Sequence, residues 1–243
     1  MTITRKAILI GAPSVKPELP GVNVDVRDIK NHLLSNKGGA WKESEITILI
    51  DPSPYLVKAH IDQAEDKDYV FITCSGHGEH RVGGNIDDTV MYLNEDDTIA
   101  ISEVNPRNKR HLVVVDVCRK IVEVKKEYST AMNKFAMENF NESHIDYRAI
   151  FDNAIMSTAE GRIVTYSCEI NQAAGDNGQG GVFTQALLKT PGVFSRPSGR
   201  SYGVLDINAA FEHARDETYR QNAPQKPVLN AGRRRDFYPF AIV

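Results

Sequence analysis

Two side chains with chemical potential follow two separate apolar runs of this sequence. Residues 68–73 lead into Cys74-Ser75-Gly76-His77-Gly78, and residues 111–117 lead directly into Cys118. Each run has the continuous Val, Ile and Phe composition of a parallel strand that is buried on both faces. The carboxyl ends of such strands open into the crevice where open α/β sheets bind ligands. If the two strands are neighbours, an imidazole base and a thiol nucleophile share one crevice, which is the chemistry of a cysteine hydrolase.

The residues around this pair fit acyl transfer. A thiol attacks a carbonyl carbon only as the thiolate, so a nearby imidazole must take its proton or lower its pKa. Gly76 and Gly78 flank His77 and let the backbone turn sharply. The backbone N–H groups of Gly78 and Cys118 are expected to point into one space and to form an oxyanion hole. The alternative is that His77 is a turn histidine and Cys118 an inert packing residue.

The other two cysteines are weaker candidates. Cys74 lies inside the apolar strand, where a buried thiol is inert, and Cys168 closes a later strand with no histidine pattern near it. Three cysteines without regular spacing indicate neither a disulfide framework nor a metal site. A reduced, cytoplasmic setting is the simplest interpretation.

The surrounding sequence must fold so that the two strand ends meet. Strands are predicted over residues 6–12, 45–51, 68–73, 111–117, 161–168 and 225–230, with a hairpin arm at 90–97. Helices are predicted over residues 25–36, 54–64 and 182–189, and Asp206 is expected to cap a longer one. Strands alternating with helices predict one α/β domain over residues 1–243.

Composition excludes several classes of function. The sequence is 41 % hydrophobic and 25 % charged, as in an ordinary globular protein, and its net charge of −3 gives no reason to expect binding to nucleic acid or to a membrane surface. The start of the sequence carries Arg5 and Lys6 and leads into only a short apolar run, so no signal peptide is predicted. No stretch approaches the roughly 20 apolar residues of a membrane span.

The two strand-end motifs resemble the catalytic pair of the caspase and metacaspase clan of cysteine peptidases. The matching segments are Ser75-Gly76-His77-Gly78 and Asp116-Val117-Cys118-Arg119. In the caspase signature Q-A-C-[RQG]-G the histidine lies about 50 residues upstream, a spacing close to the one here. The resemblance covers nearly the whole chain and includes Leu19-Pro20-Gly21, residues 180–187 and Gln225-Lys226-Pro227.

The resemblance implies a fold and an activity. The fold is a three-layer sandwich, with a sheet of about six mostly parallel strands between helices. The activity is that of a compact, prokaryotic type of caspase-like endopeptidase, with Cys118 as nucleophile and His77 as base and acid. Protein or peptide substrates are the expected partners, together with a separate activator or regulatory protein.

The sequence departs from the caspase signature at two positions, where Asp116 replaces Gln and Lys120 replaces Gly. In metacaspase-like members an Asp two residues before the nucleophile lines the pocket for the residue that precedes the scissile bond. Asp25 and Ser75 match two further pocket positions. Carboxylates at the base of a narrow pocket favour Arg or Lys and repel Asp, so the resemblance implies cleavage after basic residues. Asp25 could also serve as a helix N-cap.

Alternatives to this function stay open. The chain could be a caspase-fold scaffold that binds partners without cleaving them, or an active peptidase with another specificity. It could also be a thiol hydrolase of a different α/β family, although no third catalytic group stands out to orient His77.

Cofactors and activation are less constrained by the sequence. No cofactor or metal is expected. The acidic residues 87–88 and 95–97 lack regular ligand spacing and are typical of a solvated turn, although calcium activates some metacaspases. Self-cleavage is expected at basic residues between positions 120 and 160, namely Lys125, Lys126, Lys134 and Arg148. The alternative is that this segment packs over the sheet and stays uncut.

Overall fold

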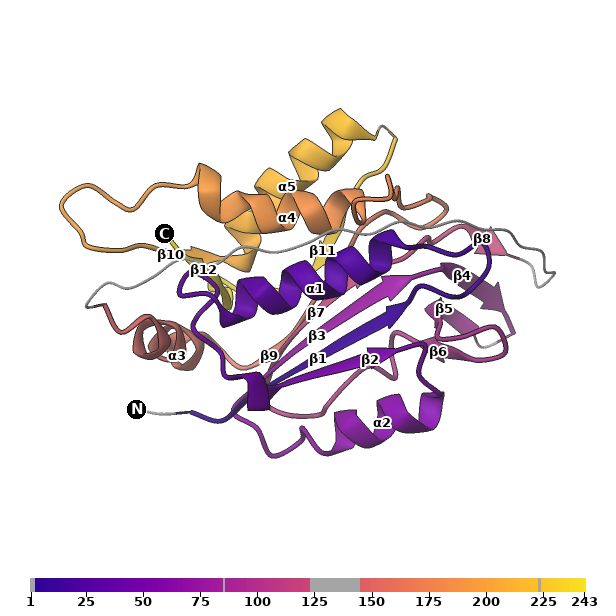
Figure 1. The fold of residues 1–243 in the computed structure, drawn as a ribbon, viewed down its shortest axis with the longest axis horizontal. Helices are drawn as coiled ribbons and strands as arrows, with labels where there is room; N and C mark the ends of the chain where they lie inside the picture. The colour runs from indigo at the N-terminus through magenta and orange to yellow at the C-terminus, as the bar shows by residue number, and fades with distance from the viewer. Residues whose placement is uncertain (1–2, 85, 123–144, 223) are drawn as a thin grey trace.

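A six-stranded sheet forms the centre of the computed structural model, which describes residues 3–84, 86–122, 145–222 and 224–243 (Figure 1). The strands lie in the order β11-β9-β7-β3-β1-β2. They are β1 (Arg5–Ala12), β2 (Ile46–Ile50), β3 (Tyr69–Gly76), β7 (Arg110–Asp116), β9 (Gly161–Tyr166) and β11 (Val228–Asn230). Every neighbouring pair is parallel except β9 and β11. The predicted six-stranded, mostly parallel sheet is confirmed.

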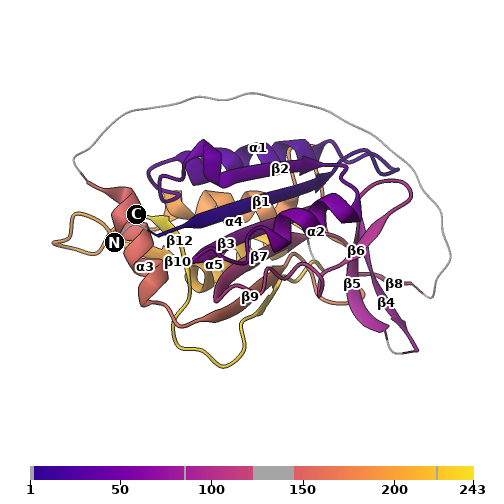
Figure 2. The same ribbon diagram turned by 90° about the horizontal axis from the view of Figure 1, so that it is seen from below.

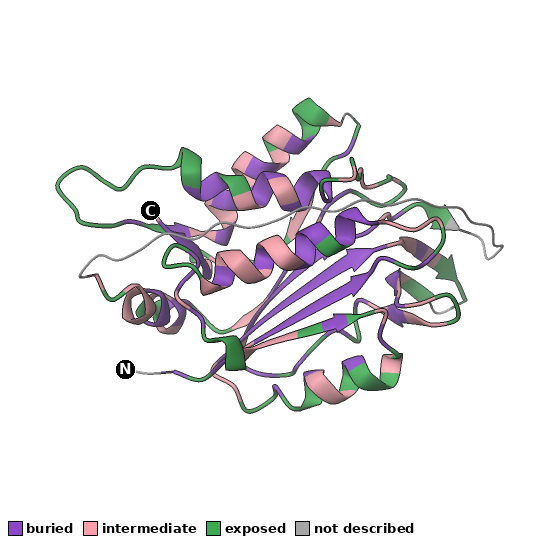
Figure 3. Ribbon diagram, in the orientation of Figure 1, coloured by how far each residue is buried: buried purple, intermediate pink, exposed green. Residues whose placement is uncertain are grey.

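Alternating side chains of the central strands build a core on each face of the sheet. Ala7 and Leu9 belong to one apolar cluster, and Ile8 and Ile10 to the other, because successive residues of a strand point to opposite faces. The first cluster includes residues of α1 (Gly21–Leu34), α3 (Tyr147–Ser157), α4 (Val182–Val193) and α5 (Ile207–Gln221). The second includes residues of α2 (Pro54–Asp62). Figure 3 shows the central strands buried along most of their length.

Helix α1 begins four residues earlier than predicted, and this changes the interpretation of Asp25. The N-cap position is Pro20, and Asp25 lies inside the helix. The early start follows from close packing on β1, where a Cβ at Gly11 would lie 2.9 Å from Val26 Cγ2 and 3.0 Å from Val22 Cγ1. The N-cap interpretation of Asp25 was therefore wrong. The predicted cap of α5 is confirmed, since the Asp206 carboxylate accepts a hydrogen bond from Ala209 N at 2.9 Å.

The predicted hairpin arm is a larger structure, a four-stranded sheet that projects from one end of the molecule (Figures 1 and 2). Its strands are β4 (Gly78–Gly83), β5 (Ile86–Tyr92), β6 (Thr98–Ala100) and β8 (Ile121–Val122). Strand β4 escaped prediction because it is polar and bounded by glycines. A two-stranded antiparallel sheet of β10 (Val204–Asp206) and β12 (Pro239–Ile242) was also not predicted.

The basic residues named for self-cleavage fall in two places. The three lysines lie outside the described residues. Arg148 lies in α3, where its guanidinium donates to the Glu45 carboxylate at 2.9 and 2.5 Å. Its side chain is largely buried against this partner. Helix α3 thus shows that the end of this segment does pack as a helix on the domain.

Candidate active site

The register of β3 and β7 brings His77 and Cys118 to one end of the sheet. The two strands are parallel neighbours, and Ser75 is paired with Asp116. His77 and Cys118 each follow two residues after this pair, so both chains leave the sheet at the same edge and in step. The two side chains line a single pocket of about 220 Å³. The prediction that they share a crevice is confirmed.

A backbone carbonyl orients the imidazole. His77 Nε2 lies 2.5 Å from the carbonyl oxygen of Pro17. Because a carbonyl can only accept, Nε2 carries the proton in this contact, which leaves Nδ1 with a free lone pair. A ring in this state can take a proton from a thiol through Nδ1. No sequence signal identifies such a partner, because every residue has a backbone carbonyl.

Burial separates Cys118 from the other two cysteines. Cys74 and Cys168 are fully buried, and burial raises the pKa of each thiol to about 12. Cys118 is only partly buried and its Sγ lies 3.7 Å from the carbonyl oxygen of Ala174. Burial, and then the nearby Asp116 carboxylate, raise the pKa of the Cys118 thiol above its ordinary value. The resting thiol is therefore protonated and needs a base to become a nucleophile.

The pocket wall beside the thiol contains two buried carboxyl groups. Asp25, 1 % exposed, accepts hydrogen bonds from Gly181 N at 2.9 and 3.1 Å, Gln185 Nε2 at 3.0 Å and Ser75 Oγ at 3.1 Å. Burial, and then the charge of Asp116, raise the pKa of Asp25 well above its ordinary value. All three residues predicted for substrate binding, Asp25, Ser75 and Asp116, line the pocket.

Asp116 is held in place by the start of α4. Its Oδ2 accepts from Thr184 N at 3.1 Å and from Thr184 Oγ1 at 2.6 Å, while burial raises its pKa. Gly181 fits between the two acidic side chains, since a Cβ there would lie 2.3 Å from Asp116 Oδ2 and 3.2 Å from Asp25 Oδ2. Sequence reasoning singled out residues 180–187 without assigning them this role.

Gln225 holds the loop of residues 174–176, which also lines the pocket. It is 1 % exposed, its Oε1 accepts from Gly175 N at 2.9 Å, and its Nε2 donates to the carbonyl oxygen of Ser167 at 2.9 Å. One amide thereby ties the end of β9 to the loop that carries Ala174 and Asp176, two further pocket residues. A buried amide with both ends satisfied fixes backbone geometry as well as stability.

Gly78, one of the two residues predicted to form the oxyanion hole, packs beside the nucleophile segment. Gly78 opens β4 and lies against Val117, where a Cβ would come within 2.6 Å of the valine Cγ2. The close contact explains the glycine and brings this part of the backbone beside the nucleophile segment. The roles of the Gly78 and Cys118 N–H groups remain a prediction.

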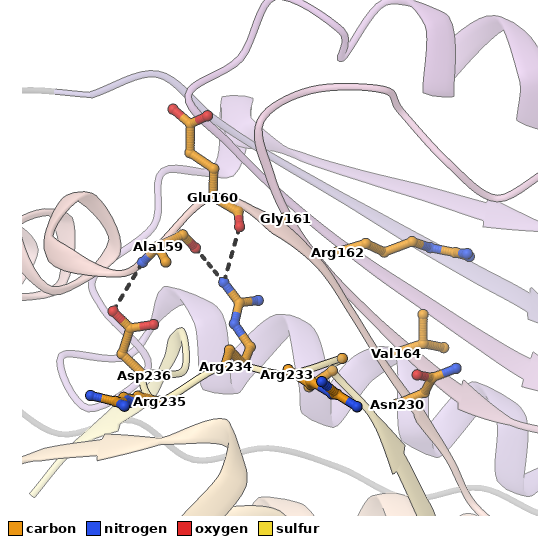
Figure 4. A pocket seen from close by; sticks show the side chains of 12 residues that line it. Ala159, Glu160, Gly161, Arg162, Val164, Asn230, Arg233, Arg234, Arg235 and Asp236 are labelled. Atoms are coloured by element: carbon orange, nitrogen blue, oxygen red, sulfur yellow. Dashed lines mark hydrogen bonds between the residues drawn. The ribbon is translucent and has the colours of Figure 1, made fainter.

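A more voluminous hollow, of about 710 Å³, lies away from this site (Figure 4). It is lined by residues around the start of β9 and by the segment after β11, including Arg162, Arg233, Arg234 and Arg235. Its lining has no thiol or imidazole, and it adjoins the amino end of β9, whereas His77 and Cys118 lie at the carboxyl ends of β3 and β7. It therefore offers none of the chemistry of the smaller pocket.

The described part of the chain offers neither a cluster of metal ligands nor a helix that could span a membrane. There, no three His, Cys, Asp or Glu side chains gather in a way that could hold a metal ion. In the acidic turn at residues 95–97, which was considered as a calcium site, the Asp97 carboxylate already accepts a hydrogen bond from Asn94 Nδ2 at 3.1 Å. Over the same residues, no helix has the length and apolar character needed to cross a membrane.

Comparisons with known proteins agree with this architecture. Residues 4–238 match the family model of the peptidase C14 caspase domain. The structure is similar to caspase-1 from Spodoptera frugiperda, with a TM-score of 0.58 and 13 % identity over 94 % of this chain and 86 % of that one. It is also similar to protein GSU0716 from Geobacter sulfurreducens, with a TM-score of 0.58 and 19 % identity over 93 % of this chain and 92 % of that one. No curated protein matches the sequence.

Proposed function

Because this chain belongs to the caspase-domain family of peptidases, we propose that it is a cysteine endopeptidase that cleaves after Arg or Lys. Cys118 is the nucleophile and His77 the base and acid. The observation that carries the proposal is that a single pocket of the described structure holds a half-buried thiol, an imidazole whose Nδ1 can accept a proton, and two buried carboxyl groups.

The reaction proceeds in two acyl-transfer steps. His77 Nδ1 takes the proton of the Cys118 thiol as the sulfur attacks the peptide carbonyl carbon, and the N–H groups of Gly78 and Cys118 stabilise the oxyanion. The imidazolium then gives its proton to the leaving amine, which departs and leaves a thioester on Cys118. Water, deprotonated by His77, attacks the thioester carbonyl, and the thiol recovers its proton as the acid product leaves.

The two buried carboxyl groups supply the specificity. A guanidinium or ammonium group that enters the pocket lined by Asp25 and Asp116 would form charge-assisted hydrogen bonds and offset the cost of keeping two acids out of water. A substrate Asp would bring a third carboxylate to the same place and would be rejected. The negative charge of Asp116 raises the pKa of the Cys118 thiol, and the positive charge of the substrate would oppose this. Binding of a basic substrate would therefore lower the thiol pKa.

The test is a panel of peptides that differ only in the residue before one scissile bond, with products identified by mass spectrometry. We expect the wild type to cut after Arg and Lys, and both Cys118→Ala and His77→Ala to abolish turnover. Cys74→Ala, which removes a buried thiol, is the matched control and should retain activity. Efficient cleavage after Asp would overturn the specificity, and absence of any cleavage by wild type would favour a caspase-fold scaffold.

A further inference from the structure

A buried arginine follows the nucleophile and points away from the substrate pocket. Arg119 is 7 % exposed, is absent from the pocket lining and reaches toward the four-stranded arm. Its Nε donates to Thr89 Oγ1 at 2.9 Å, a second guanidinium nitrogen donates to the carbonyl oxygen of Cys168 at 3.1 Å, and the guanidinium lies 4.0 Å from the centre of the Tyr166 ring. The residue next to Cys118 is thus anchored to β5 and to the end of β9.

The anchor on the arm belongs to a longer polar chain. Thr89 of β5 and His80 of β4 are cross-strand partners, and both are at most 4 % exposed. His80 Nδ1 lies 3.2 Å from Thr89 Oγ1, and His80 Nε2 lies 2.9 Å from Asp87 Oδ1. The guanidinium can only donate, so Thr89 Oγ1 accepts there and its own proton can go to His80 Nδ1. With Nε2–H directed to Asp87, every contact then has one donor and one acceptor.

Backbone hydrogen bonds hold the same segment from both sides. Arg119 N donates to the Gln172 carbonyl at 2.9 Å, and Asn171 N donates to the Arg119 carbonyl at 2.8 Å. On the arm side, His80 N donates to the Lys120 carbonyl at 3.0 Å. The segment after the nucleophile therefore lies between the arm and the loop after β9. On the arm, the Thr89 hydroxyl accepts the hydrogen bond from the Arg119 side chain.

We propose that Thr89, itself oriented by His80, is a positioning residue for Cys118 that acts through Arg119. The inference rests on the proposed function for its effect on turnover, but its structural consequence does not. Without the hydroxyl, the Nε–H of a buried guanidinium loses its acceptor, which is costly, and the segment from Cys118 to Lys120 relaxes to recover one. Small displacements of a nucleophile slow the chemical step strongly.

Two substitutions separate the hydroxyl from the volume of the side chain. Thr89→Val keeps the shape and removes both hydrogen bonds, whereas Thr89→Ser keeps the hydroxyl and loses only a methyl group. Thr218→Val is the matched control, because Thr218 is fully buried in α5 and its hydroxyl has no hydrogen-bond partner among the described residues.

The first readout is amide hydrogen exchange, which needs no enzymatic activity. In Thr89→Val we expect faster exchange in peptides that contain residues 118–122 and 168–174, with exchange in α1 and β1 unchanged. Thr89→Ser and Thr218→Val should leave the exchange of these peptides as in wild type. A role in stability alone would instead raise exchange throughout the domain.

The second readout is steady-state kinetics on a basic peptide. We expect Thr89→Val to lower kcat about 10-fold with KM within about twofold, and Thr89→Ser to restore most of kcat. Unchanged local exchange together with wild-type kcat in Thr89→Val would overturn the inference. If wild type has no turnover but Thr89→Val still loosens residues 118–122, the proposed function fails while the positioning role stands.

Discussion

Replacing Asp116 by Asn tests how the pocket selects its substrate. The amide oxygen can take the place of Oδ2 and accept both hydrogen bonds from Thr184, so the fold around the site is kept. The amide nitrogen then takes the place of Oδ1, and the buried group carries no negative charge. The substitution removes the charge and leaves the shape, which makes it a test of electrostatics and not of packing.

The expected magnitude follows from one charge-assisted hydrogen bond. Its loss costs about 1.5–3 kcal/mol, which corresponds to a drop in kcat/KM of about 10- to 100-fold for a peptide with Arg before the scissile bond. The charge of Asp116 raises the pKa of Asp25, so Asp25 ionises more readily in the variant and compensates in part. We therefore expect a loss near the lower end of this range at neutral pH.

The assay compares two peptides that differ only in Arg against citrulline, its neutral isostere, before the scissile bond. For Asp116→Asn, kcat/KM should fall for the Arg peptide and change by less than about threefold for the citrulline peptide. Asp206→Asn is the matched control, because Asn also caps helices and the site lies elsewhere. An Arg-to-citrulline ratio that is the same in wild type and Asp116→Asn would refute the assignment of Asp116 to the specificity pocket.

Three further outcomes are expected. A proton on Asp25 competes with the substrate cation, so KM for Arg peptides should fall as pH rises through the raised pKa of Asp25. A KM that does not change with pH in wild type, or a pH dependence of KM that Asp25→Asn leaves unchanged, would contradict this. The pKa of Asp25 lies above the ordinary 3.8, so above about pH 4 the folded state keeps a proton that the unfolded state releases. The free energy of unfolding, measured by urea titration, should therefore fall as pH rises above about 4. In Asp25→Asn this fall should be shallower. In concentrated wild-type protein, new amino termini should follow the lysines between positions 123 and 144 and never the ion-paired Arg148; equal fragments in Cys118→Ala would show a contaminating protease.

The strand ends could be predicted from the sequence because buried parallel strands have an unmistakable composition. The apolar runs before His77 and Cys118 gave the location of both residues, and the observed pairing of Ser75 with Asp116 shows that they leave the sheet together. The acidic pocket positions came from the resemblance to a family. In the structure they line the same pocket.

Other parts of the site depend on contacts that have no local signal. The Pro17 carbonyl is a backbone group, and the contact of Gln225 with Gly175 joins residues 50 positions apart. Strand β4 has polar residues because its pairing with β5, and not burial of an apolar face, holds it in the sheet. The start of α1 was misplaced because the fit of Val22 against Gly11 is a tertiary contact.

The most direct test of the proposed active site is covalent labelling with a peptide chloromethyl ketone that ends in Arg, followed by peptide mapping. Such a reagent alkylates a thiol fastest where the pocket for the basic side chain and the nucleophile lie together. We expect one adduct per chain, on Cys118, that forms much more slowly in His77→Ala and is not formed by the matching Asp reagent. An adduct on Cys168, or equal labelling by the Asp and Arg reagents, would contradict it.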